Sequence, residues 1–309
     1  MIQSIMSCLH SSTMPLAVAG IGIMAIACTG EGVPATVSPN GSTISVVTTL
    51  YPLEYFARRI GGERVTVVNL VEPGVEAHSF APTPADIRKL DGADVILYND
   101  PAFEPWIPRA LAAISSRDRA VTRTGQGGEG KDYGLDSHVW LDPQFAVNQV
   151  RLIHSALVKE DPEGAAVYAT NATVLVADLE ALHSRFSSSL HSCNRDHFVT
   201  SHAAFGHMAN RYGLEQVSIS GLSPEAVPGA GHMAEIADTI RELGVEYVMV
   251  EPVIGTGFAE TLAREVGVEL LPLHPLESLT PEQSKAGENF ISLMEANLES
   301  LSLALGCNT

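Results

Sequence analysis

Residues 161–190 read DPEGAAVYATNATVLVADLEALHSRFSSSL, and the expected division of the chain into two lobes follows from this stretch. Asp161 followed by Pro162 is typical of a helix start, because proline is tolerated at the first helical position. No glycine or proline follows Gly164, and apolar side chains then recur at helical spacing. These apolar residues are Val167, Val174, Leu175, Leu179, Leu182 and Phe186. A helix of about 28 residues measures roughly 40 Å, which is longer than a crossover between neighbouring strands needs, so we predict a rigid connecting helix between two lobes at residues 161–192.

The sequence on both sides of this connector alternates short β-branched runs with helical stretches. The predicted strands are 44–49, 65–71, 95–98 and 120–121 before the connector, and 198–201, 217–220, 247–250 and 270–273 after it. Such alternation predicts a mostly parallel sheet in each half, because parallel strands need crossover helices. The expected fold is α/β, with two parallel-sheet lobes at 44–160 and 193–309 joined by the long helix.

Three further helix starts are marked by a capping residue before a proline. Thr83, Asp142 and Thr280 each occupy that place, and Gln283 has the capping-box spacing from Thr280. We expect a helix to begin at each of these positions.

The N-terminal segment has the pattern of an export signal. Residues 1–28 contain no Asp, Glu, Lys or Arg, and the apolar run 15–27 is shorter than the roughly 20 residues that span a membrane. This run ends in Ala-Ile-Ala before Cys28, which resembles a bacterial lipobox. We predict a lipoprotein signal peptide at 1–28, lipidation of Cys28 and a flexible tether at 29–43. Because basic residues are missing ahead of the apolar run, an uncleaved anchor or a mis-assigned start codon is the alternative.

Composition excludes some classes of partner. The 309-residue chain has 18 Lys and Arg against 36 Asp and Glu, a formal net charge of −18. Nucleic-acid binding needs a basic face, so no nucleic-acid partner is expected. The summed negative field instead attracts a cationic ligand.

Cysteine usage agrees with export. Cys8 falls in the predicted signal peptide, and Cys28 carries the predicted lipid. Cys193 and Cys307 are then the two that remain in the mature protein, and we predict a disulfide between them, as in proteins of oxidising compartments.

Four histidines lie where ligands bind in α/β proteins. His78, His202 and His274 follow predicted strands, and His138 lies in a loop that leads to a helix start. Ligands of open α/β sheets bind beyond the carboxyl ends of strands, so the four side chains are expected to meet in the cleft between the lobes. Neutral imidazole suits zinc, and four protein ligands leave no position for a reactive water, so we predict a binding site and not a hydrolytic one.

The fourth ligand has two candidates. His274 comes from the second lobe, opposite the ligands of the first, whereas Glu76 shares a loop with His78 and needs a local turn to reach the same ion. We favour His274. The chain also has no HExxH, GxSxG, Walker A or dinucleotide-binding motif, so the usual signatures of hydrolases and nucleotide-dependent enzymes are missing.

The chain from residue 44 to about residue 305 resembles the zinc- and manganese-binding solute-binding proteins of ABC importers. The motifs that carry the resemblance are TTLYP at 48–52, EPGVEAHSFAPTP at 72–84, HVWLDP at 138–143, SHAAFG at 201–206, RYGL at 211–214 and ISGLSPE at 219–225. The resemblance implies two α/β lobes joined by one long helix, no enzymatic activity, and capture of a divalent metal for delivery to a permease.

The resemblance also implies site residues. His78, His138 and His202 match the family's metal-binding histidines, and a histidine in third place followed by the segment 223–225 is similar to the zinc branch. The family usually has aspartate at the position of His274, and many zinc members carry a His-rich loop where residues 124–136 here contain no histidine.

The function expected from the sequence is thus capture of Zn²⁺ by a monomer that is lipid-anchored outside the cytoplasm or periplasmic. Its expected partners are an ABC permease with its ATPase, and the membrane through the anchor. The alternatives are a manganese or iron binder of the same family, a zinc-dependent enzyme with Glu76 as general base, and an adhesin or interaction lipoprotein.

Overall fold

The computed structural model describes residues 43–126, 136–253 and 255–307. All of them belong to one compact unit, Pro39–Thr309. The predicted signal peptide with Cys28, the tether up to residue 42 and most of the loop 124–136 lie outside the described residues.

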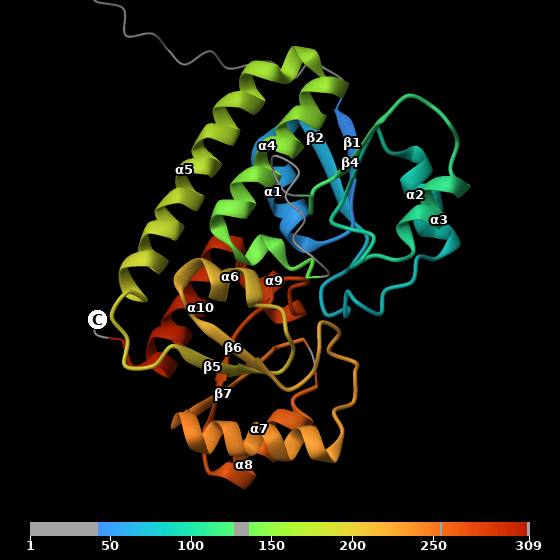
Figure 1. Ribbon diagram of the computed structural model, residues 1–309. Helices are drawn as coiled ribbons and strands as arrows, with labels where there is room; N and C mark the ends of the chain where they lie inside the picture. The colour runs from blue at the N-terminus through green and yellow to red at the C-terminus, as the bar shows by residue number, and fades with distance from the viewer. Residues whose placement is uncertain (1–42, 127–135, 254, 308–309) are drawn as a thin grey trace, which may run out of the picture. The chain divides into compact units, whose positions relative to one another are not determined.

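The first lobe is built on a parallel sheet of the strands β1 to β4 (Figure 1). Their order in the sheet is β2-β1-β3-β4, and all three strand pairs are parallel. A crossover helix therefore connects each strand to the next one in sequence. The strands are β1 Ile44–Thr48, β2 Val65–Asn69, β3 Val95–Tyr98 and β4 Ala120–Arg123, and the crossover helices are α1 Tyr51–Gly61, α2 Pro84–Gly92 and α3 Ile107–Ala113.

The second lobe repeats this topology. Its sheet has the order β6-β5-β7-β8, and all its strand pairs are parallel. The strands are β5 His197–Thr200, β6 Glu215–Ser218, β7 Tyr247–Val250 and β8 Glu269–Pro272, and the helices are α6 Gly206–Tyr212, α7 Ala230–Leu243, α8 Gly257–Val266, α9 Pro281–Ala286 and α10 Phe290–Leu305. The prediction of two parallel-sheet α/β lobes is confirmed.

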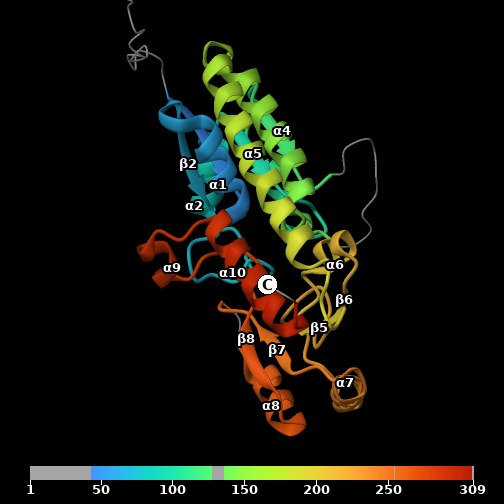
Figure 2. The same ribbon diagram turned by 90° about the vertical axis from the view of Figure 1, so that its left-hand side faces the viewer.

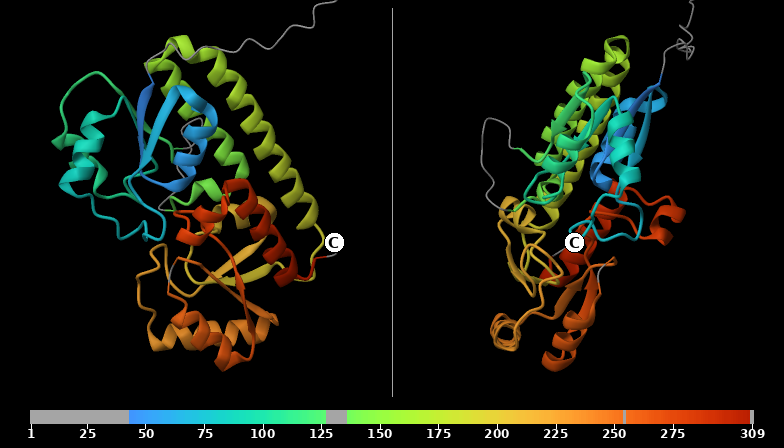
Figure 3. Two further views of the ribbon diagram at one scale, coloured as in Figure 1. Left: turned by 180° about the vertical axis from the view of Figure 1, so that it is seen from behind. Right: turned by 90° about the vertical axis from the view of Figure 1, so that its right-hand side faces the viewer.

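The long connecting helix is α5, Ala165–Ser189. It packs along α4, Pro143–Glu160, and its far end lies beside α10 of the second lobe (Figures 2 and 3). Its buried side chains are Tyr168, Leu175, Leu179, Leu182 and Phe186. By length and composition alone Pro162–Ser189 could cross a membrane, but this apolar stripe packs against the protein core.

The predicted capping residues begin helices as expected. Thr83 closes a capping box with Asp86 at the start of α2, and Thr280 does so with Gln283 at the start of α9. The carboxylate of Asp142 accepts from the backbone N–H of Gln144 and caps α4. Each cap satisfies backbone N–H groups that have no partner inside the first turn.

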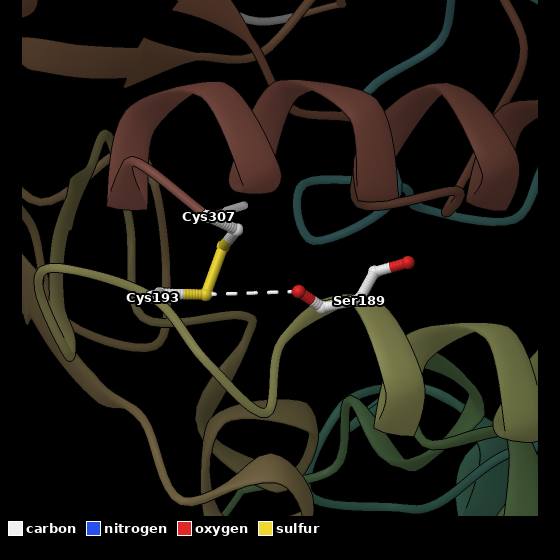
Figure 4. The surroundings of a disulfide bond; sticks show 3 residues. All are labelled: Ser189, Cys193 and Cys307. Carbon is white, nitrogen blue, oxygen red and sulfur yellow. Dashed lines mark hydrogen bonds between the residues drawn. A yellow bond between two sulfur atoms is a disulfide. The ribbon is translucent and has the colours of Figure 1, made fainter. Parts of the chain in front are cut away.

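A disulfide joins Cys193 to Cys307, as predicted (Figure 4). Cys193 follows α5, and Cys307 follows α10, so the bond fastens the start of the second lobe to the end of its last helix. The two backbones also form an isolated antiparallel bridge at this point.

Removing this bond is expected to destabilise the fold without abolishing it. The cysteines are 114 residues apart in sequence, and a closed loop of that size stabilises by about 4–5 kcal/mol in the chain-entropy model. Urea unfolding of the double variant Cys193→Ser/Cys307→Ser should show most of that loss, and either single variant should match it. A double variant as stable as the wild type would contradict this expectation.

Candidate metal centre

Four side chains converge at one point between the two sheets. One potential ligand atom from each of His78, His138, His202 and Glu277 lies within 4.8 Å of the other three. We call these four residues the metal cluster. The centroids of the three imidazole rings are 5.1, 5.3 and 5.6 Å apart, and Oε1 of Glu277 lies 3.4 Å from Nε2 of each histidine.

The topology of the sheets explains the convergence. His78 follows β2 and His138 lies between β4 and α4 in the first lobe, while His202 follows β5 and Glu277 follows β8 in the second. The carboxyl ends of parallel strands share one edge of a sheet, so loops that follow them meet. The loops at the carboxyl ends of the strands in both sheets therefore meet at the metal cluster.

Glu277 belongs to the second lobe by sequence but is bound to the first. Its backbone oxygen accepts from the N–H of Tyr51 (3.2 Å), and Gly74 donates to the backbone oxygen of Leu279 (2.7 Å). Nε1 of the fully buried Trp140 donates to the backbone oxygen of Pro275 (2.7 Å). These bonds place the segment 275–279 against the first lobe.

The backbone turns sharply just before Glu277. Leu276 has a φ of 57°, the sole positive value of a non-glycine residue among the described residues. A branched side chain rarely adopts this left-handed conformation, which costs on the order of 1–3 kcal/mol and tends to persist at functional sites. Here the turn directs the next residue, Glu277, into the cluster.

His274 does not join the cluster. Its Nε2 contacts Oε1 of Gln283 (2.9 Å), and its Nδ1 accepts from the N–H of Leu276 (2.9 Å). Both ring nitrogens are therefore occupied by hydrogen bonds, one with the turn at Leu276 and the other with Gln283 at the start of α9. We favoured His274 as the fourth ligand, but the fourth side chain that lies with the three histidines in the structure is Glu277.

Glu76 also lies outside the cluster. Its two carboxylate oxygens accept from the backbone N–H groups of His78 (3.0 Å) and Ser79 (2.8 Å). This arrangement closes the loop that carries His78, so Glu76 shapes the site without being one of its four members.

Two further carboxylates contact the Nδ1 atoms of two cluster histidines, on the side of each ring that faces away from the cluster. Nδ1 of His138 lies 2.8 Å from Oδ1 of Asp136, and Nδ1 of His202 lies 2.6 Å from Oε1 of Glu251. Because a carboxylate accepts a hydrogen bond from Nδ1–H, the proton stays on Nδ1 and the lone pair of Nε2 faces the cluster. Neither carboxylate was predicted from the sequence to support a ligand, although Glu251 directly follows a predicted strand.

The charges of the cluster are strongly coupled. Burial alone would lower the pKa of His202, but the carboxylates of Glu251 and Glu277 beside its ring raise this pKa to about 10. Burial opposes protonation of His138 as well, yet Asp136 and Glu277 raise its pKa. Burial would raise the pKa of Glu277, but the three histidines hold it well below its usual range. Protons thus occupy positions that a bound cation would take over.

Comparison with known proteins gives consistent matches. A family model described as "Zinc-uptake complex component A periplasmic" matches residues 46–304. The chain is 34% identical over 275 residues to the zinc-binding lipoprotein AdcA of Streptococcus pneumoniae, covering 84% of this chain and 55% of AdcA. It is 30% identical over 301 residues to the high-affinity zinc uptake system protein ZnuA of Bacillus subtilis, covering 92% and 94%.

A solved structure shows the same fold. The crystal structure of the Zn(II)-bound ZnuA-like domain of Streptococcus pneumoniae AdcA matches with a TM-score of 0.77 and 34% identity, over 85% of this chain and 99% of that domain. The chain spans about half the length of the AdcA relatives that it matches, and their similarity concerns this domain.

Proposed function

This chain belongs to the family of periplasmic zinc-uptake components, and we propose that it captures Zn²⁺ between its lobes and delivers the ion to the permease of an ABC importer. The observation that carries this proposal is the metal cluster, in which three imidazoles and one carboxylate converge within 4.8 Å. Zinc binds histidine nitrogen and carboxylate oxygen in a four-coordinate tetrahedral shell. A shell filled by protein ligands has no open position for a reacting water, which suits carrying an ion and not catalysis.

The ligand set favours zinc over manganese. Imidazole nitrogen suits zinc, whereas manganese prefers carboxylate and water oxygen. The cluster supplies a single carboxylate, Glu277, with three imidazoles. We therefore infer selectivity for zinc, and a manganese or iron carrier is the alternative outcome of metal titration.

We also propose that the protein is located outside the cytoplasm. The relative AdcA is named a lipoprotein, and residues 25–28 here resemble a lipobox. We infer that residues 1–28 act as a signal peptide, that Cys28 carries the lipid, and that residues 29–43 tether a monomer to the membrane beside its permease and ATPase.

Metal titration tests the binding part of this function. Calorimetry on purified metal-free protein at pH 7.5 should show one zinc ion per chain and much weaker uptake of manganese. Growth of a strain that lacks this protein, on zinc-depleted medium, tests delivery: the wild-type gene should restore growth, and the variant His202→Ala should not. Absence of saturable zinc uptake would refute the proposal.

Zinc binding is expected to release protons at neutral pH. The pKa of His202 is raised to about 10 and that of His138 is raised as well, so zinc must displace protons from the metal-free site. Affinity should rise with pH through the neutral range by about tenfold per pH unit for each proton released. Calorimetry at pH 7.5 in two buffers of different ionisation enthalpy should show that at least about one proton is released for each zinc ion bound. Equal heats in both buffers would contradict this result.

A further inference from the structure

We propose that Glu251 is a positioning residue of the metal site, which fixes the orientation and tautomer of His202. This inference rests on the proposed zinc binding. Glu251 directly follows β7, next to β5, whose end carries His202. Its Oε1 lies 2.6 Å from Nδ1 of His202 and 3.2 Å from the backbone nitrogen of the same residue. One carboxylate oxygen therefore holds both the ring and the backbone of the ligand.

The tautomer follows from this contact. A carboxylate at Nδ1 keeps the proton on that nitrogen and leaves the lone pair of Nε2 free for a metal. Nε2 of His202 is buried and has no hydrogen-bond partner among the described residues, and the same holds for Oε1 of Glu277, 3.4 Å away. Two buried polar atoms that face one another without a hydrogen bond are costly unless an ion binds both.

The burial of Glu251 adds a second argument. Its side chain is 1% exposed and that of His202 is 0% exposed. Oε2 of Glu251 has no hydrogen-bond partner in the part of the chain that the structure describes. A buried carboxylate with a free oxygen is expensive without positive charge nearby. A dication held by Nε2 supplies that charge across the imidazole ring.

His138 offers an internal comparison. Its Nδ1 contacts Asp136 in the same manner, but the Asp136 side chain is 22% exposed and also lies near His207 of α6. Water screens the charge of Asp136 more than that of Glu251. Loss of the carboxylate should therefore cost more zinc affinity at Glu251 than at Asp136.

The test compares Glu251→Gln and Glu251→Ala with the wild-type protein. Glutamine keeps the size and one acceptor oxygen but removes the charge, and we expect the Kd for zinc to rise about 10-fold; for alanine we expect about 100-fold. Asp136→Asn should have a smaller effect than Glu251→Gln. The matched control is Asp161→Asn, which removes a carboxylate bound to Arg64 and Tyr168 at the start of α5; it should lower stability and leave the Kd unchanged.

Cobalt(II) supplies a readout that a purely structural role would not move. The visible absorption of Co²⁺ in the site should change in Glu251→Gln, because the His202 ligand changes, and should stay as in the wild type for Asp161→Asn. Wild-type zinc affinity in both Glu251 variants would overturn the positioning role and leave the proposed function intact. A wild-type protein that binds no zinc would overturn both.

Discussion

Replacing Glu277 by glutamine is expected to weaken zinc binding by about 100-fold to about 4,000-fold. Glu277 is the anionic member of the metal cluster, and its carboxylate is surrounded by the three histidines. Removing one partner from a buried charged set costs about 3–5 kcal/mol, and each 1.4 kcal/mol is a factor of ten in Kd. Competition with a zinc chelator of known affinity measures this change.

His274→Gln is the matched control. His274 lies two residues after the end of β8 and contacts Gln283 and Leu276, outside the cluster. The variant should lose some stability because the turn loses a hydrogen bond, and its zinc affinity should change far less than in Glu277→Gln. A zinc affinity reduced more by His274→Gln than by Glu277→Gln would mean that the sequence-based choice of ligand was right.

Truncating Trp140 to alanine should cost about 3–5 kcal/mol of unfolding free energy. This side chain is fully buried, its Nε1 bonds to Pro275 in the other lobe, and its ring lies 5.4 Å from that of His138. Zinc affinity should fall as well, because the indole packs on a ligand and supports the segment that carries Glu277. Urea unfolding with and without zinc measures both effects.

Trp140→Phe separates packing from hydrogen bonding. Phenylalanine keeps an aromatic ring but cannot donate to Pro275, so the loss should be nearer 1–3 kcal/mol, from an unsatisfied buried carbonyl. If the alanine and phenylalanine variants have equal free energies of unfolding, the cavity left by alanine contributes little to the loss. Packing of the ring would then contribute little to stability at this position.

The fold was predictable because its signals are local. Each strand of the described residues begins within two positions of its predicted start, since β-branched runs and capping residues act within a few residues of themselves. The long helix was predictable for the same reason. Its first turn, Pro162–Gly164, is a 3-10 helix instead, where Asp161 accepts from the N–H of Gly164.

The metal cluster was predictable only in part. His78, His138 and His202 lie in loops that follow strands, and sheet topology brings such loops together. Glu277 was missed because its place depends on the turn at Leu276 and on hydrogen bonds to the first lobe, which span more than 200 residues of sequence. No local pattern contains those contacts. The sequence pointed to Glu277 only through its position, three residues after His274.

Anomalous diffraction at the zinc absorption edge, on crystals of the zinc-loaded protein, would show directly whether zinc binds at the metal cluster. We expect one peak in the metal cluster, with Nε2 of each of the three histidines at about 2.0–2.1 Å and a carboxylate oxygen of Glu277 at about 2.0–2.2 Å. A peak bound by His274 in place of Glu277, or zinc held elsewhere with the cluster empty, would contradict it.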